Sequence, residues 1–204
     1  MTDGVRQAGA TDRATVVELV FEGFKDDPST RWSLPADDYE GRLRRSIEFD
    51  VDDALEAGEV WLTAGGESVA WWSPAATREE RLREVEQYFR DDAETYGDRL
   101  GAVTAAELAI IDELPSESEF RYLEALATRA DSRRRGHATA VLAPGLERAA
   151  GEGVAAVLDA DNPEVLAFYE SVGFRQLAKV EVAGAPTAWV MVFEPASPGT
   201  FGTI

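Results

Sequence analysis

The sequence predicts an α/β fold in which helices flank one mixed β-sheet. Its 204 residues fit a single domain with room for a sizeable core, and 45% of them are hydrophobic, enough to fill that core. Apolar runs typical of strands are interleaved with segments of helical periodicity, in the order β, αα, ββ, αα, β, α, β, α, β, β. We therefore expect residues 1–195 to form one domain, followed by a flexible tail rich in Pro, Gly and Ser over residues 196–204.

The chain is expected to begin with a short strand over residues 5–9 and a helix that Thr11 or Asp12 caps. Apolar residues recur in this helix at helical spacing, at Val16, Val17, Leu19, Val20 and Phe24. Asp27-Pro28 is expected to end it. A longer helix is expected over residues 35–57, and Gly58 would end that one.

The middle of the chain predicts a hairpin and a helix pair. Residues 59–63 and 68–72 are apolar runs separated by a glycine turn, which favours two paired strands. The charged segment 77–112 predicts two helices broken near Gly97 or Gly101. Segments 28–60 and 74–118 should shape the pocket for a substrate.

The second half predicts alternating strands and helices. Strands are expected over residues 120–128, 154–158, 174–182 and 188–194, and helices over residues 135–151 and 163–172. Gly184-Ala185-Pro186 would join the last two strands.

The charge of the chain limits its partners. Its 39 Asp and Glu outnumber 20 Lys and Arg, which gives a net charge of -19. Nucleic acid and anionic membranes would approach this surface against Coulomb repulsion, so neither is expected as the main partner. Only Lys25 and Lys179 among the basic residues are lysines. The preference for arginine over lysine, combined with the acidity, is typical of proteins adapted to high salt. A GC-rich genome would explain the preference for arginine but not the acidity.

The chain has no cysteine and one histidine, His137, which excludes disulfides, cysteine-ligated metals and any site that needs two imidazoles. The N-terminus has no basic segment followed by an apolar run, and no apolar run reaches about 18 residues. We expect a cytoplasmic protein without a metal.

A loop after the strand at 120–128 has the composition of an anion-binding site. Arg133, Arg134 and Arg135 precede Gly136 and Ala138 at the start of a helix, where backbone N–H groups lack intrahelical partners. Small residues let a phosphate approach the backbone, and arginines add charge-assisted hydrogen bonds. No Gly-Lys-Ser/Thr closes a P-loop, and the dinucleotide glycine spacing is absent. A solvated helix start is the alternative interpretation.

Two motifs in order resemble the GNAT family of N-acetyltransferases. Leu126-Ala127-Thr128 followed by Arg133-x-x-Gly136-x-Ala138 resembles its acetyl-CoA signature, and residues 158–174, with Asn162 and Tyr169-Glu170-x-x-Gly173-Phe174, resemble its second conserved segment. More loosely, residues 14–31, 142–149, 180–182 and 187–189 look like the puromycin N-acetyltransferase branch.

The resemblance implies the acyl-CoA N-acyltransferase fold, a mostly antiparallel sheet with a bulged strand. It also implies an enzyme that transfers acetyl from acetyl-CoA, as co-substrate, to a primary amine of a small molecule or peptide in a ternary complex. A monomer or homodimer is expected. A non-catalytic acyl-CoA-binding regulatory module on the same fold is the alternative, and intact Tyr169 and the uninterrupted arginine loop speak against it.

The resemblance also implies roles for individual residues. Main-chain groups of Leu126, Ala127 and Thr128 would bind the pantetheine. The phosphates would bind at the loop, which comprises Arg133, Arg134, Arg135, Gly136, His137, Ala138 and Thr139. Asn162 would bind pantetheine or cap the following helix.

Two residues are the candidate catalytic groups. Tyr169 would protonate the leaving sulfur of CoA, although its spacing also suits a packed aromatic side chain. Strand alternation predicts Tyr122, Glu124 and Leu126 on one face. Glu124, an acid in an apolar strand, would remove a proton from the amine directly or through water, but many relatives use water chains and Glu124 could instead be a surface carboxylate. His137 is not expected to act in catalysis. Core and cleft-wall positions are expected for Trp61, Trp71 and Trp72.

Overall fold

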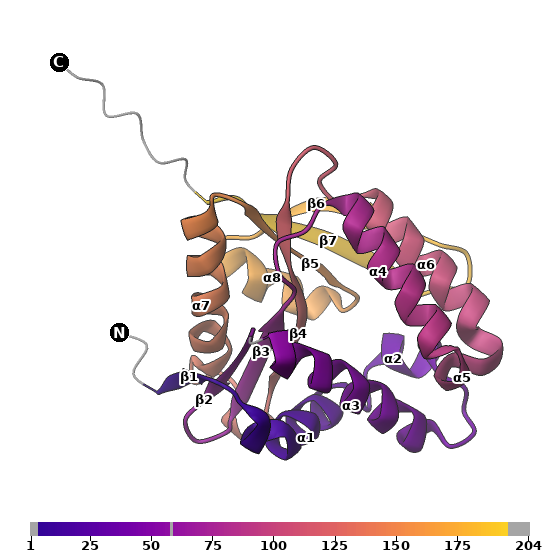
Figure 1. The fold of residues 1–204 in the computed structure, drawn as a ribbon, viewed down its shortest axis with the longest axis horizontal. Coiled ribbons are helices and arrows are strands. Elements are labelled where there is room, and N and C mark those ends of the chain that lie inside the picture. The colour runs from indigo at the N-terminus through magenta and orange to yellow at the C-terminus, as the bar shows by residue number, and fades with distance from the viewer. Residues whose placement is uncertain (1–3, 58, 196–204) are drawn as a thin grey trace.

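Seven strands form one mixed sheet in the order β1-β2-β3-β4-β5-β7-β6, with helices on both faces (Figure 1). The computed structural model describes residues 4–57 and 59–195. The strands are β1 Val5–Gln7, β2 Val60–Thr63, β3 Ser68–Trp72, β4 Phe120–Thr128, β5 Ala155–Ala160, β6 Arg175–Val180 and β7 Ala188–Phe193. All neighbouring strands pair antiparallel except β4 and β5, which are parallel. The predicted mixed α/β class and its mostly antiparallel sheet are confirmed.

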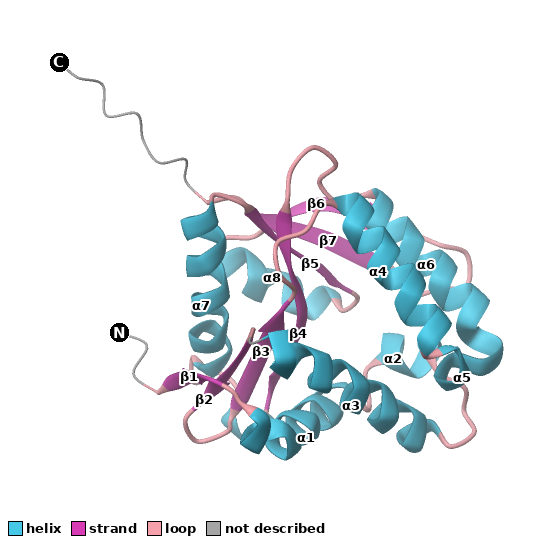
Figure 2. Ribbon diagram, in the orientation of Figure 1, coloured by secondary structure: helices cyan, strands magenta, loops and turns pink. Residues whose placement is uncertain are grey.

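Eight α-helices cover the two faces of the sheet in the described ranges (Figure 2). They are α1 Arg13–Phe24, α2 Pro28–Ser33, α3 Tyr39–Ala57, α4 Arg78–Asp91, α5 Ala93–Tyr96, α6 Leu100–Asp112, α7 His137–Glu152 and α8 Pro163–Ser171. Side chains from α1 and α3 to α6 join one core cluster with the sheet, whereas α7 and α8 contribute to a second cluster on the other face. Within the described part of the chain, no helix has both the length and the apolar composition needed to cross a membrane.

One predicted boundary was wrong for a clear physical reason. The helix expected to end at Asp27-Pro28 ends at Phe24, and Asp27-Pro28 instead begins α2. The Asp27 carboxylate accepts hydrogen bonds from the amides of Ser29 and Thr30, both at 3.0 Å, and proline is favoured at a first helical position because it has no N–H to leave unpaired.

Other boundaries moved by a few residues. The helix expected from residue 35 begins at Tyr39, after Asp38 in a left-handed conformation with φ 51°. Gly97 (φ 52°) ends α5, which confirms a break near it, but α4 already ends at Asp91, so the segment forms three α-helices instead of two, and Gly101 lies inside α6. The strand expected over 154–158 extends to Ala160, which adds Asp159 to its cavity-facing side. The helix stop at Gly58 and the tail 196–204 lie outside the described residues.

Candidate active site

The parallel strands β4 and β5 pair over only part of their length. Their registered pairs join Phe120, Arg121 and Tyr122 to residues 155–157, although β4 continues to Thr128 and β5 to Ala160. On its other edge β4 stays paired with β3 as far as Thr128. Within the described residues, the edge of β4 that faces β5 therefore lacks a strand partner beyond Tyr122. Backbone groups along such an edge need hydrogen-bond partners, which a ligand with amide groups would provide.

A β-bulge lies in β4 at Glu124. Trp72 of β3 pairs with Leu123 and Trp71 with Ala125, so Glu124 is the extra residue. A bulge shifts the alternation of side chains by one position. Accordingly Tyr122, Ala125 and Ala127 join one core cluster, whereas Leu123 and Leu126 pack with the other. The alternation expected to place Tyr122, Glu124 and Leu126 on one face was thus wrong beyond the bulge.

The bulge brings Glu124 into contact with a cation. Arg81 of α4 donates two hydrogen bonds to its carboxylate, one of 2.9 Å from Nη2 to Oε2, and the Ser73 hydroxyl donates a third. The Arg81 guanidinium also lies 4.5 Å from the centre of the Tyr122 ring. Its side chain is only 12% exposed, so this ion pair is shielded from solvent.

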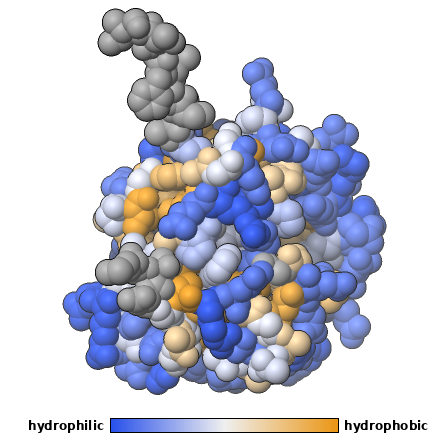
Figure 3. Space-filling model, turned by 60° about the vertical axis from the view of Figure 1, so that its left-hand side comes forward, coloured by the Kyte–Doolittle hydropathy of each residue, from blue (hydrophilic) through white to orange (hydrophobic). Residues whose placement is uncertain are grey.

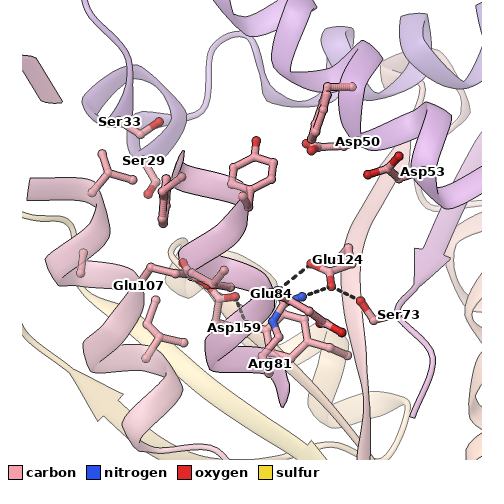
Figure 4. Close-up of a pocket in the computed structure, with 18 of the residues that line it drawn as sticks. Ser29, Ser33, Asp50, Asp53, Ser73, Arg81, Glu84, Glu107, Glu124 and Asp159 are labelled. Atoms are coloured by element: carbon pink, nitrogen blue, oxygen red, sulfur yellow. Dashed lines mark hydrogen bonds and ion pairs between the residues drawn. The ribbon is translucent and has the colours of Figure 1, made fainter. Parts of the chain in front are cut away.

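A cavity of about 920 Å³ opens in front of this pair (Figure 4). Both segments expected to shape a substrate pocket, 28–60 and 74–118, contribute to its wall. The cavity is acidic and aromatic. Its carboxylates are Asp50, Asp53, Glu84, Asp91, Glu107, Glu124, Asp159 and Asp161, its cations are Arg81 and Arg83, and its aromatic residues are Trp32, Phe49, Trp71, Trp72, Tyr88, Phe89, Tyr96 and Tyr122.

Several of these carboxylates hold protons more tightly than usual. Burial, then the negative charge of Glu124, raises the pKa of Asp50 to about 8. Burial, with the charge of Asp27, raises the pKa of Asp161 to about 6. Burial also raises the pKa values of Glu107 and Asp159, which lie close enough to affect each other. The cavity thus contains more acidic side chains than the two arginines that line it, Arg81 and Arg83, can pair with.

Tyr122 and Asp159 lie where β4 and β5 separate. The Tyr122 hydroxyl donates a hydrogen bond to Oδ1 of Asp159. Burial, then the charge of Asp159, holds the pKa of the Tyr122 phenol well above its ordinary value, so it remains a donor.

Tyr169 is half-buried on α8, beyond the end of β5. Its ring packs edge-on against Phe174, with centroids 5.8 Å apart, and tilted against Phe168 at 5.3 Å. Burial raises the pKa of the Tyr169 phenol, and the charges of Asp159 and Asp161 raise it further. The phenol is therefore protonated at neutral pH, as a proton donor has to be.

Asn162 has the capping contact that was one of its two expected roles. Its Oδ1 accepts a hydrogen bond of 2.9 Å from the amide of Glu164, and Pro163 follows it at the first helical position. Its expected contact with pantetheine stays a prediction.

The arginine loop forms the start of α7. Gly136 has a φ of 85°, a conformation that favours glycine, and the helix expected from residue 135 therefore begins at His137. Arg134 also has a positive φ, of 60°. The side chains of Arg133, Arg134 and Arg135 are exposed, and the amides of His137, Ala138 and Thr139 lie in the first turn, where helix geometry leaves them without intrahelical partners.

Sequence reasoning missed four residues of the cavity. Arg81, Glu107 and Asp50 lie on helices that the sequence marked only as charged or amphipathic, and nothing in the sequence places them beside Glu124. Asp159 carried a signal, because it is an acid at the end of an apolar strand and lies within the second motif, residues 158–174.

Solved structures with low sequence identity share this fold. The histone acetyltransferase HPA2 and related acetyltransferase of Corynebacterium glutamicum has a TM-score of 0.71 and 22% identity, with 96% of this chain and 97% of that chain covered. The polyamine N-acetyltransferase of Drosophila melanogaster has a TM-score of 0.65 and 12% identity, with coverage of 93% and 98%. The PaiA N-acetyltransferase of Thermoplasma acidophilum, solved in complex with coenzyme A, has a TM-score of 0.55 and 10% identity, with coverage of 93% and 97%.

Residues 48–174, more than half of the chain, match the model of a family described as the acetyltransferase (GNAT) family. This protein belongs to the GNAT family of acetyltransferases.

Proposed function

We propose that this protein is an acetyl-CoA-dependent N-acetyltransferase that acetylates a primary amine of a small, cationic molecule in a ternary complex. The observation that carries the proposal is the junction of two features at one point: the unpaired edge of β4 meets an acidic cavity at Glu124, Tyr122 and Asp159. Bringing an amine and a thioester together at such a point can lower the barrier by about 7–11 kcal/mol.

The residues around the opening fit coenzyme A. The main chain of Leu126, Ala127 and Thr128 lies on the unpaired edge of β4 and would bind the amides of pantetheine. Asn162 would add a contact from the start of α8. The phosphates would bind at the start of α7 through Arg133, Arg134, Arg135, Gly136, His137, Ala138 and Thr139. Open space around the α-carbon of Gly136 favours this, since a phosphate could approach the backbone there. Bound acetyl-CoA supplies the activated acetyl group.

The proton transfers are assigned to two residues. Tyr169 would give its proton to the departing sulfur, consistent with a raised pKa that keeps the phenol protonated. Glu124, at the bulge, would receive the ammonium group of the acceptor and accept its proton directly or through water. Arg81 and Ser73 already donate hydrogen bonds to both oxygens of this carboxylate, which raises the question of a second carboxylate.

The acidic wall of the cavity favours a cationic acceptor. Two solved structures with this fold are agmatine and polyamine N-acetyltransferases, whose substrates carry more than one positive charge. The finer resemblance to puromycin N-acetyltransferases keeps puromycin among the candidate acceptors. The alternative is a regulatory module that binds acyl-CoA without turnover.

A thiol-release assay with acetyl-CoA tests the proposal. The amines are agmatine, putrescine, butylamine, phenylethylamine, puromycin and a peptide with a free N-terminus. Putrescine and butylamine form a matched pair that differs in one ammonium group. We expect kcat/KM for putrescine to exceed that for butylamine by at least about tenfold, or 1.4 kcal/mol. CoA binding without release for any amine would favour the regulatory module, and absence of both would exclude the proposal.

The same assay carries an arm at molar salt. We also propose that the protein is a monomer or homodimer that works in a cytoplasm of high salt concentration, without nucleic acid or membrane as a partner, as its net charge of -19 suggests. Activity and stability should then increase with salt, because screening weakens repulsion between surface carboxylates. Lower activity and stability in molar salt would contradict the salt adaptation without affecting the proposed reaction.

A further inference from the structure

Of the cavity carboxylates Glu107, Glu124 and Asp159, only Glu107 has no hydrogen-bond partner among the described residues. It lies on α6 and points into the cavity toward Asp159, as Figure 4 shows. The two other carboxylates already accept hydrogen bonds from protein side chains. Glu124 accepts hydrogen bonds from Arg81 and Ser73, and Asp159 accepts one from Tyr122. Lone pairs of Glu107 are therefore available to an incoming ammonium group.

The charges around Glu107 come from three elements. Asp159 of β5 and Glu124 of β4 are negative, and Arg81 of α4 is positive. Arg81 is hydrogen-bonded to Glu124 and stacked on the ring of Tyr122. Its positive charge is thus shared by the carboxylates of Glu107, Glu124 and Asp159. Burial and the charge of Asp159 raise the pKa of Glu107, and Arg81 only partly opposes them. Its raised pKa lets Glu107 bind a proton, whereas both carboxylate oxygens of Glu124 already accept hydrogen bonds from Arg81 or Ser73.

Resting on the proposed function but moving its base from Glu124 to a second carboxylate, we propose that Glu107 is the catalytic general base: it takes the first proton from the acceptor's ammonium group, while Glu124 only orients that group.

The proton balance is complete. The ammonium gives one proton to Glu107, which later releases it to solvent, and the neutral amine forms the C–N bond as the C–S bond breaks. The nitrogen loses a second proton, which restores the phenol of Tyr169 after Tyr169 has protonated the sulfur. The products are the amide, CoA with a free thiol and one proton in solution, with no oxidant or metal required.

Substitution of each carboxylate separates proton removal from simple charge attraction. With agmatine as acceptor, Glu107→Gln should lower kcat/KM at neutral pH by about 10²-fold or more and abolish the acid-side decline of kcat/KM. Glu107→Asp should restore part of the activity together with that decline. Glu124→Gln and the charge-matched control Asp53→Asn, in a cavity residue of α3, should raise KM and retain the decline.

If kcat/KM of Glu107→Gln keeps the acid-side decline of the wild type and only KM is higher, the proposal is overturned. Glu107 would then only attract the positive charge of the acceptor. Loss of the limb in Glu124→Gln instead would assign the base to Glu124. CoA affinity, measured by calorimetry, shows whether each variant is folded.

A second readout does not depend on turnover. In protein with ¹³C-labelled glutamate side chains, the carboxyl resonance missing from Glu107→Gln should titrate well above the ordinary glutamate value of about 4.3. Titration at the ordinary value would contradict the proposal. If no amine supports thiol release, the proposed function fails, but this titration still tests whether Glu107 can hold the proton.

Discussion

The surroundings of the Tyr169 phenol determine whether it is protonated at neutral pH. Two rings and the acids at the end of β5 surround the Tyr169 side chain, and burial disfavours its phenolate. A phenol in such a place is a poor base at neutral pH. Its hydroxyl stays protonated at neutral pH, so it is available as a donor to a group that leaves beside it.

Tyr169→Phe should lower kcat by about 10²-fold or more, because the departing thiolate would lose its proton donor while the packing of the ring is kept. The dissociation constant for CoA, measured by calorimetry, should stay within about twofold of wild type. The control is Tyr39→Phe, which removes a phenol bonded to the carbonyl of Lys25 outside the cavity. A normal kcat in Tyr169→Phe would remove Tyr169 from the proposed role.

Single residues differ in how well the sequence predicts them. Gly136 and Tyr169 belong to short motifs, so their places in the chain were predictable. Arg81 and Glu107 lie in the cavity with acids of strands some 40 and 50 residues away in sequence, and the ion pair of Arg81 with Glu124 spans 43 residues. No local pattern encodes such a contact. Asn162 was ambiguous because one side chain can cap a helix and also bind a ligand.

At the scale of elements, α7 lies against β3 through a glycine. A β-carbon at Gly145 would collide with the indole of Trp72, which is 1% exposed. The helix can approach the sheet this closely because Gly145 has no side chain. The contact fixes α7, and with it the arginine loop at its start, against the strand that pairs with β4.

Gly145→Ala should destabilise the protein by about 1–3 kcal/mol, because the added methyl group overpacks the contact with Trp72. Gly151→Ala in the same helix is the matched control, since no atom lies within 4 Å of its added methyl group. There the better helix propensity of alanine should stabilise by roughly 0.5–1 kcal/mol. Urea denaturation measures the free energy of unfolding of both variants. Equal changes in the two variants would refute the close approach of α7 to Trp72.

Strand and helix bounds were predictable where apolar periodicity was strong, as for β4, whose observed range equals the predicted one. The family resemblance implied a bulged strand, but the position of the bulge at Glu124 was not predicted, because a register shift depends on the partner strand and leaves the apolar pattern of one strand almost unchanged. Asp27-Pro28 shows a second difficulty. The same dipeptide favours both the end of one helix and the start of the next, and only the capping contacts decide.

At the scale of the molecule, acidity has two different consequences. The face shown in Figure 3 is mostly hydrophilic, and most of the ion pairs lie between exposed side chains, where each contributes little. Inside the cavity, the same residue types are partly buried and hold their protons more tightly. Folding therefore depends on pH through the cavity more than through the surface at near-neutral pH.

The free energy of unfolding should fall as pH rises from about 5 to 8. The folded-state pKa of Asp50, about 8, lies above its unfolded value of about 3.9. In this window the folded state keeps a proton that the unfolded state has lost, so the stabilisation is complete below about pH 4 and is lost as pH rises through about 8. Asp161 acts with the same sign.

Asp50→Asn should flatten this pH dependence and make the protein more stable than wild type at pH 8 by at least about 1 kcal/mol. Urea unfolding at fixed salt and several pH values gives the slopes, with Asp53→Asn of the same helix as control. Identical slopes in wild type and Asp50→Asn would show that Asp50 is not the group responsible.

The short parallel pairing of β4 and β5 divides the sheet into two pieces that are each continuous in sequence, β1 to β4 and β5 to β7, with only three registered residue pairs along their seam. A ligand lying in that seam would bridge both pieces and take over the hydrogen bonds that the missing pairs would make. Its binding free energy would then add to the cohesion of the whole sheet. Under the proposed function, the co-substrate would thus act as an additional strand of the sheet, bound at the start of each catalytic cycle and released at its end.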